Sequence, residues 1–302
     1  MTLRVGVLVV QNLPWPQWRS RVLEVEELGY DGVYVWDHLV HRTQEPTDPL
    51  FDGLTLLAAA ATVTSRIRLG TLVASPTIRH PVLLAKQAMT VDNVSGGRLE
   101  LGIGAAGVHL DYLALGIEPY SRTEQVSRFR DTVEIVDAVL RGASTYGGTH
   151  WSGEGVTMAP GSVQWPRLPL TIAAHGPRTL AVAGRFADVW NSITPRGVPA
   201  DEVIPFFTSR ARLLDQAAIE AGRDPATIRR SVMLGSDEWP MLASPADFRD
   251  AVLRYAEVGV NDVVLPHPDH PAEARLSHGR AAPDVVRRIA EDVLPELRAE
   301  LE

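Results

Sequence analysis

Short apolar runs alternate with longer amphipathic stretches along almost the whole chain. The short runs, such as residues 4–10 (RVGVLVV), are apolar almost throughout, which is typical of strands buried on both faces. The longer stretches carry apolar residues at helical spacing. Residues 80–97, for example, have a proline near the start and a glycine pair at the end, as helices do. The pattern therefore predicts a parallel sheet covered by helices.

Eight strand–helix units follow one another without a linker. The predicted strands are residues 4–10, 31–38, 67–75, 98–106, 168–176, 189–193, 228–236 and 262–268. Before the fifth strand, residues 144–167 are rich in Gly, Pro and Trp and are predicted to form an excursion or short hairpin. The predicted fold is α/β: a single (β/α)8 TIM barrel over residues 1–302. A doubly wound protein of two domains is the alternative.

Composition narrows the class of partner. The net charge is −8 and no basic block occurs, so we expect a small-molecule substrate and neither nucleic acid nor an anionic membrane surface. The absence of cysteine excludes disulfides and thiolate chemistry and suits a cytoplasmic location. No apolar run reaches the roughly 18 residues that a membrane span requires.

A glycine pattern, Gly102-x-Gly104-x-x-Gly107, follows the fourth apolar run and matches a dinucleotide-binding fingerprint. That fingerprint belongs in the first strand–helix turn, with an acidic residue at the next strand end about 20 residues later. Here three units precede the glycines, and the acidic candidate Glu124 lies in a predicted helix. In a barrel, the glycines would allow close approach to a flat ligand or simply ease the strand into its loop.

Polar residues gather where the predicted strands end, and TIM-barrel active sites form at the carboxyl ends of strands. Asp37 and His38 end the second strand, and histidine is the usual proton donor or acceptor near neutral pH. An ordinary loop histidine is the alternative. The pairs His38/His41 and His267/His270 lack a carboxylate at ligand spacing, so no metal site is expected.

Two adjacent strand ends suggest a phosphate site. In residues 175–180 (HGPRTL), Pro177 begins a predicted helix and Arg178 lies in its first turn, where free amides and the helix dipole favour anions. The next strand end adds two hydroxyls and a cation: Ser192, Thr194 and Arg196. We expect a phosphate between these loops, with ordinary helix capping as the alternative.

Taken together, these stretches resemble a known family. Residues 70–107 closely resemble the signature of the bacterial luciferase-like monooxygenase superfamily, and residues 33–38, 112–116 and 173–191 resemble it at the expected places. The resemblance implies a TIM barrel, commonly a homodimer, that binds FMN or the deazaflavin coenzyme F420 at the carboxyl mouth. It also implies a non-proline cis peptide at Leu72-Val73, against which the isoalloxazine ring rests.

The same resemblance supplies roles for residues. Asp37 and His38 match the pair near the ring in deazaflavin members, where the histidine handles the proton that accompanies hydride transfer. The expected cofactor-binding residues are Asp37, Leu72, Val73, Ala74, Gly104, His175, Gly176, Pro177, Arg178, Ser192, Ile193, Thr194 and Arg196.

One stretch departs from the family pattern. Many members read GAGWNEPEY after the fourth strand, whereas residues 104–112 read GAAGVHLDY. Val108 and His109 replace the polar Asn and Glu, so a catalytic role borrowed from those residues is in doubt. His109 becomes a candidate replacement, and the predicted catalytic residues are His38, Asp37 and His109.

Three functions are compatible with these residues. The leading hypothesis is an oxidoreductase that moves a hydride between F420 and a small organic substrate, with His38 as proton donor or acceptor. The alternative is an FMN-dependent monooxygenase that uses O2 and reduced flavin from a partner reductase. A third is a flavin-binding relative without catalytic activity. The sequence does not name the substrate.

Overall fold

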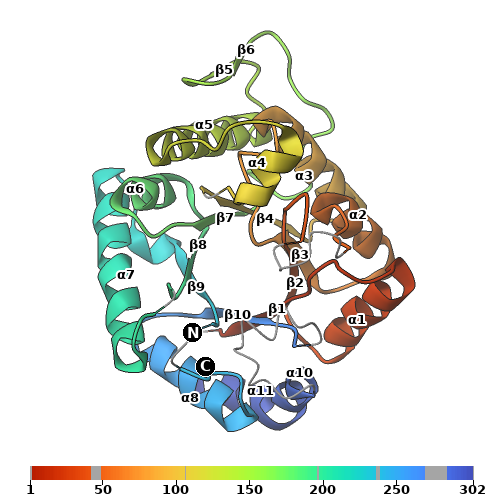
Figure 1. Ribbon diagram of the computed structural model, residues 1–302, viewed down its shortest axis with the longest axis vertical. Coiled ribbons are helices and arrows are strands. Elements are labelled where there is room, and N and C mark those ends of the chain that lie inside the picture. Colours follow the sequence, from red (N-terminus) through yellow and green to blue (C-terminus); the bar gives the residue numbers. More distant parts are fainter. Residues whose placement is uncertain are drawn as a thin grey trace.

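The computed structural model describes residues 2–41, 49–105, 107–195, 197–235, 239–268 and 284–301. Eight parallel strands close into a barrel, and helices surround it (Figure 1). In order around the barrel, the strands are β1 (Arg4–Leu8), β2 (Gly32–Val35), β3 (Arg68–Thr71), β4 (Leu99–Gly104), β7 (Leu170–Ala173), β8 (Val189–Ile193), β9 (Arg229–Met233) and β10 (Asp262–Pro266). The predicted TIM barrel is confirmed.

The outer layer contains the helices that the periodicity predicts. They are α1 (Trp15–Glu27), α2 (Gly53–Val63), α3 (Pro81–Ser95), α5 (Arg122–Leu140), α6 (Pro177–Phe186), α7 (Val203–Glu220) and α8 (Pro245–Glu257). Local sequence sets their ends: α3 begins at Pro81 and stops at Gly96, which adopts a left-handed conformation. Short 3-10 turns, η1 (Ala200–Glu202) and η2 (Pro225–Thr227), flank α7.

Three segments differ from a simple barrel. Within residues 144–167, β5 (Tyr146–Gly147) pairs antiparallel with β6 (Ser152–Gly153), and this hairpin projects beyond α5 (Figure 1). The helix α4 (His109–Leu115) was not predicted, because seven residues make too few turns to show a periodic pattern. The last predicted helix is divided into three parts: α10 (Val285–Arg288), the π-helical η3 (Ile289–Val293) and α11 (Leu294–Leu301).

The core has two parts. The larger part fills the layer between sheet and helices, and a smaller apolar cluster lies apart from it. The smaller cluster contains Leu8, Val10, Tyr34, Trp36, Leu72, Met233 and Val264. Several of its members stand at or just beyond the carboxyl ends of strands, so it provides an apolar floor for that end of the barrel.

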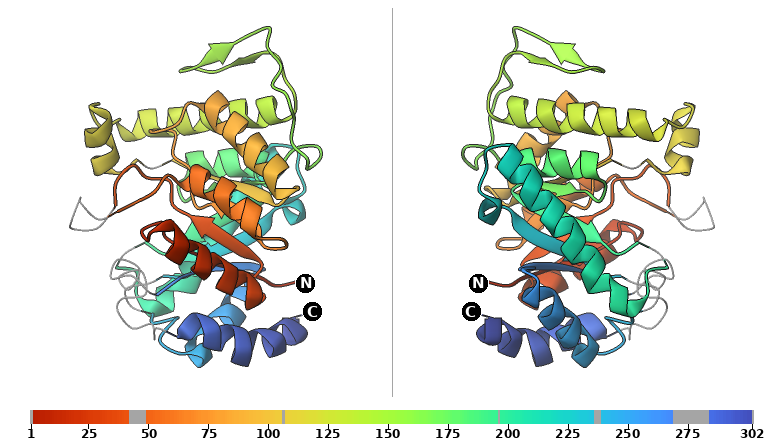
Figure 2. Two further views of the ribbon diagram at one scale, coloured as in Figure 1. Left: turned by 90° about the vertical axis from the view of Figure 1, so that its right-hand side faces the viewer. Right: turned by 90° about the vertical axis from the view of Figure 1, so that its left-hand side faces the viewer.

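The two ends of the barrel are clearly separated. Figure 2 shows both chain termini at one end and α4 at the other. The carboxyl ends of the parallel strands lie on the α4 side, which we call the mouth; the amino ends lie on the side of the termini, which we call the base. No helix among the described residues is long and apolar enough to span a membrane.

Candidate active site at the mouth of the barrel

The parallel strands bring their carboxyl ends, and the polar residues that follow them, to the mouth. The third strand ends in the cis peptide Leu72-Val73, at the position that the family resemblance implied. Val73 and Ile193 pack against the inner apolar cluster that contains Leu72 and Met233. The mouth therefore has an apolar floor edged by polar groups, which is the usual make-up of a cofactor site.

The glycine pattern has a packing role beside this cis peptide. A Cβ added at Gly102 would lie 2.0 Å from the Thr71 carbonyl oxygen, and one at Gly104 would lie 2.4 Å from Cγ2 of Val73. Both distances are far below normal contact, so β4 can lie against the end of β3 only with glycine at these positions. The close approach predicted for these glycines is therefore made to β3.

His38 is held by a carboxylate that the sequence analysis did not single out. Its Nδ1 lies 2.7 Å from Oδ2 of Asp111, whose other oxygen accepts the amide of Leu39 at 2.9 Å. A carboxylate only accepts, so Nδ1 donates and Nε2 is the nitrogen left for other chemistry. Asp111 is fully buried in the first turn of α4, while the His38 side chain keeps 11% of its surface exposed.

Asp37, next to His38 in sequence, has a different environment. It is buried, and both of its carboxylate oxygens accept hydrogen bonds from Arg79, with Nη2–Oδ1 at 2.6 Å and Nε–Oδ2 at 2.9 Å. Arg79 also pairs with Asp52, the N-cap of α2. The Asp37 carboxylate thus forms an ion pair with Arg79 next to His38, and this pair fixes the loop after β2. The catalytic role predicted for Asp37 stays a prediction.

His109 lies close to this pair in sequence but is exposed at the start of α4. The residue that contacts His38 from α4 is Asp111, two positions further on. The position of Asp111 could have been inferred from the sequence, because an acidic residue in the first turn of a helix that follows a barrel strand lies near the mouth. The absence of visible helical periodicity in α4 concealed that signal.

Two side chains at the mouth have buried polar atoms without partners among the described residues. Asn12, which follows β1, is 4% exposed, yet neither atom of its amide makes a hydrogen bond. His175, which follows β7, has no partner for its buried Nδ1. Burial, together with the charge of Arg210, lowers the pKa of His175 below its ordinary value. Unsatisfied buried groups are rare, and they mark a place where a bound molecule would supply the missing hydrogen bonds.

The two loops predicted to bind phosphate lie at neighbouring strands, since β7 pairs with β8. Gly176 caps α6, and Pro177 occupies its first turn, so this helix begins at the mouth with exposed amides. Arg178 is exposed and lines a groove between α5 and α6. From β8, Ser192 is buried, Ile193 and Thr194 are half-buried, and Arg196 lies outside the described residues.

Metal ligation has no support in the described part of the chain, where no three His, Asp or Glu side chains converge. The site assembled at the mouth thus contains an apolar floor, a carboxylate-bound histidine, two unpartnered buried polar groups and a helix N-terminus. These features suit an organic cofactor with a flat ring and an anionic tail.

Known proteins resemble this chain in sequence and in fold. An F420-dependent glucose-6-phosphate dehydrogenase of Beutenbergia cavernae is 27% identical over 319 aligned positions, covering 91% of each chain. The solved structure of an F420-dependent secondary alcohol dehydrogenase, in complex with an F420-acetone adduct, superposes with a TM-score of 0.76 at 15% identity, covering 94% of this chain and 99% of the other.

The monooxygenase RslO1 of Streptomyces bottropensis superposes with a TM-score of 0.75 at 23% identity, covering 97% of this chain and 99% of the other. The sequence model of the luciferase-like monooxygenase family matches residues 4–236. That match covers most of the chain, including the strands that build the mouth. The chain belongs to the luciferase-like monooxygenase family.

Proposed function

We propose that this protein is an F420-dependent oxidoreductase that transfers a hydride to or from a small organic substrate. The observation that carries the proposal is the His38–Asp111 pair, which engages Nδ1 of an imidazole whose ring centroid lies 6.2 Å from that of Trp36 in the apolar floor. Support also comes from the relatives: the glucose-6-phosphate dehydrogenase and the alcohol dehydrogenase are both F420-dependent.

The residues of the mouth fit this cofactor. Leu72, Val73 and Ile193 offer an apolar surface for the ring, and Asn12 and His175 have hydrogen-bonding capacity that no protein group uses among the described residues. The amides at the start of α6, together with Ser192, would hold the phosphate. F420, when bound, supplies the hydride acceptor or donor.

A side chain of the protein transfers the proton that accompanies the hydride. Asp111 accepts from Nδ1 of His38, which keeps the imidazole in one tautomer and one orientation. Neutral His38 would take a proton from an alcohol at Nε2, and the resulting imidazolium would give that proton to a carbonyl substrate in the reverse direction. Arg79 and Asp37 hold the loop that carries His38 at the mouth.

A titration tests the cofactor. Trp36 follows β2 and belongs to the apolar floor of the mouth, so a ligand bound there is expected to quench its fluorescence. F420, FMN, FAD and the nicotinamide coenzymes are added separately. Tightest binding of F420 supports the proposal. Tightest binding of FMN favours a monooxygenase supplied by a partner reductase, and binding of nicotinamide coenzymes alone contradicts both flavin hypotheses.

Replacement of the histidine tests the chemistry. We expect His38→Ala to keep its affinity for F420 and to lower turnover by about 10²–10⁴-fold, the usual contribution of a positioned acid or base. His109→Ala tests the competing candidate, the exposed histidine at the start of α4, and is expected to keep full activity. Full activity of His38→Ala would remove His38 from this role, and loss of activity in His109→Ala alone would transfer the role to His109.

We also propose a cytoplasmic homodimer. On α3, Leu83 is 53% exposed and Val94 is 47% exposed. Eleven residues make about three helical turns, so both side chains lie on one face of the helix, where a second copy would cover them. Light scattering of the purified protein measures the mass, and a dimer that dissociates in Leu83→Glu supports this face. A monomeric wild type contradicts the proposal.

A further inference from the structure

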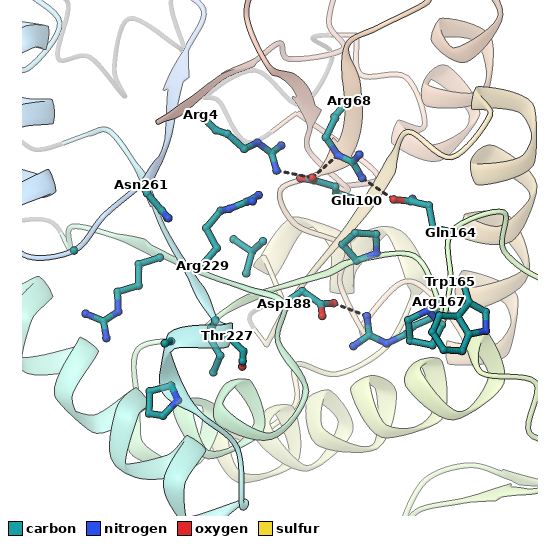
Figure 3. Close-up of a pocket in the computed structure, with 18 of the residues that line it drawn as sticks. Arg4, Arg68, Glu100, Gln164, Trp165, Arg167, Asp188, Thr227, Arg229 and Asn261 are labelled. Atoms are coloured by element: carbon teal, nitrogen blue, oxygen red, sulfur yellow. Dashed lines mark hydrogen bonds and ion pairs between the residues drawn. The ribbon is translucent and has the colours of Figure 1, made fainter. Parts of the chain in front are cut away.

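A cavity of about 800 Å³ lies at the base of the barrel, at the opposite end from the mouth (Figure 3). Its wall comes from the amino ends of strands: Arg4 begins β1, Arg68 begins β3 and Arg229 begins β9. The loop with Trp165 and the turn η2 form other parts of the wall. The proposed oxidoreductase activity assigns no role to this cavity.

A row of alternating charges crosses the base of the barrel, and its members Arg4, Arg68, Glu100 and Arg229 line the cavity. Arg4 and Arg68 both pair with Glu100, with Arg4 Nη1 at 2.8 Å from Oε1. Arg4 Nε also lies 3.7 Å from Oδ2 of Asp262, and Arg229 Nη1 lies 4.0 Å from the same oxygen. Three guanidinium groups therefore share two carboxylates, and the row has an excess of positive charge.

That excess is concentrated at Arg229. A separation of 4.0 Å is too long for a hydrogen bond, so among the described residues its guanidinium has no hydrogen-bonding partner. Its side chain is 38% exposed toward the cavity that it lines. Burial raises the pKa of Asp262 to about 6. In mildly acidic solution this carboxylate therefore becomes protonated and no longer neutralises the charge of Arg229. Arg229 thus presents a fork of unused donors, the geometry that binds phosphate oxygens in pairs.

The other arginines of the cavity have structural partners. Arg167 pairs with Asp137 and Asp188, and it donates to the carbonyl at the end of α6. Arg230 pairs with Asp215 at 2.7 Å. These arginines neutralise carboxylates and helix C-termini, as cations near the end of a helix commonly do. The guanidinium of Arg229, by contrast, has donors that no described residue accepts.

An aromatic surface completes the cavity. Trp165 is 91% exposed, although tryptophan is normally the side chain that gains most from burial. It lines the same cavity as Arg229 (Figure 3). An indole face so exposed can stack on a planar ring, and the cavity volume is that of sites for nucleotide-sized ligands rather than single inorganic ions.

We propose that the base of the barrel is a second ligand site, which binds a nucleoside polyphosphate with its phosphates on Arg229 and Arg4 and its base against Trp165. The site is separate from the mouth, so occupancy by the ligand does not require the cofactor to leave.

Calorimetric titration of the full chain tests this proposal with three probes: ADP, pyrophosphate and adenosine. We expect Arg229→Gln to weaken ADP and pyrophosphate alike by about tenfold, the value of one lost charge-assisted contact. Trp165→Leu is expected to weaken ADP by a similar factor and to leave pyrophosphate unchanged. Arg254→Gln, at an arginine of α8 that is 53% exposed and outside the cavity, is the control and is expected to bind ADP as the wild type does.

A second titration distinguishes ADP binding at the base from ADP binding at the mouth. ADP is titrated into protein saturated with F420, and unchanged ADP affinity supports a site at the base. If F420 abolishes ADP binding, ADP occupies the mouth and the proposal is wrong. It is equally overturned if neither ADP nor pyrophosphate binds the wild type, or if Arg229→Gln and Arg254→Gln weaken binding equally. If the mouth binds FMN instead of F420, FMN takes the place of F420 in this titration, and the outcomes for the base are the same.

Discussion

The two ends of this barrel differ in how many of their polar residues are paired. At the mouth, His38 has a partner on one nitrogen only, and Asn12 and His175 carry buried polar atoms that no described protein group satisfies. At the base, carboxylates such as Glu100 are shared between arginines and are fully engaged. Both ends belong to the same strands, so the difference lies in the loops that join each strand to its neighbouring helices. At both ends, completely paired groups stabilise the fold, whereas incompletely paired ones mark places where ligands bind: Asn12 and His175 at the mouth, and Arg229 at the base.

The largest effect is expected from breaking the row of charges at the base. Glu100 is buried; although burial opposes ionisation, the charges of Arg4 and Arg68 lower its pKa. Glu100→Gln leaves both arginines without their shared counter-charge, and we expect it to lower the free energy of unfolding by about 3–5 kcal/mol.

Urea denaturation measures this loss, and Asp250→Asn is the control. Asp250 forms an exposed pair with Arg254, so its replacement is expected to change stability by less than about 0.5 kcal/mol. Equal stability of the two variants would show that the row at the base does not stabilise the fold.

The next effect concerns the packing under the mouth. Gly102→Ala would place a Cβ 2.0 Å from the Thr71 carbonyl oxygen, so β3 and β4 must separate. We expect a loss of about 3 kcal/mol in stability, at the upper end of the usual cost of overpacking. Gly161→Ala, where an added Cβ has no neighbour within 4 Å, is the matched control. The packing explanation fails if both variants melt at the same temperature.

Asp111→Asn is expected to act on turnover. Asparagine has nearly the same shape, but it is uncharged and its NH2 group can replace the oxygen that accepts from Nδ1 of His38. The imidazole is then no longer held in one tautomer, so we expect kcat to fall about 100-fold. The KM for F420 should change little, because Asp111 positions the histidine. Asp111→Glu is expected to restore part of kcat. A variant that loses cofactor affinity and keeps kcat would contradict the assignment of Asp111 as a positioning residue.

The smallest effect is a pH dependence at the base. Burial raises the pKa of Asp262 from 3.8 to about 6, so the folded chain holds this proton to a higher pH than the unfolded chain does. Stability from this group is therefore fully present below about pH 4 and is lost as the pH rises through about 6. We expect the difference in unfolding free energy between wild type and Asp262→Asn to change by about 2 kcal/mol across that range. A constant difference between pH 4 and pH 7 would contradict the raised pKa.

Much of the architecture could be read from the sequence because it depends on local periodicity. The eight apolar runs became the eight barrel strands, and the predicted helix at residues 80–97 became α3 with the stop at Gly96. Parallel strands necessarily bring their carboxyl ends together, so His38 and the loops after β7 and β8 could be assigned to one end of the barrel from the sequence alone.

Contacts between distant segments could not be read in this way. Asp111 pairs with a histidine 73 residues earlier, and Arg79 with an aspartate 42 residues earlier. Gly102 and Gly104 looked like ligand contacts because the sequence does not reveal that β3 occupies the space beside them.

The sequence by itself determined the fold, the family and the end of the barrel at which chemistry is expected, since all three depend on periodicity and on short motifs. Only the tertiary structure decided which polar groups are satisfied. A hydrogen bond requires atoms within about 3 Å, and segments far apart in the chain reach that distance only after packing is complete. For this reason the partner of His38 at the mouth and the unused guanidinium of Arg229 at the base became apparent only in the folded chain.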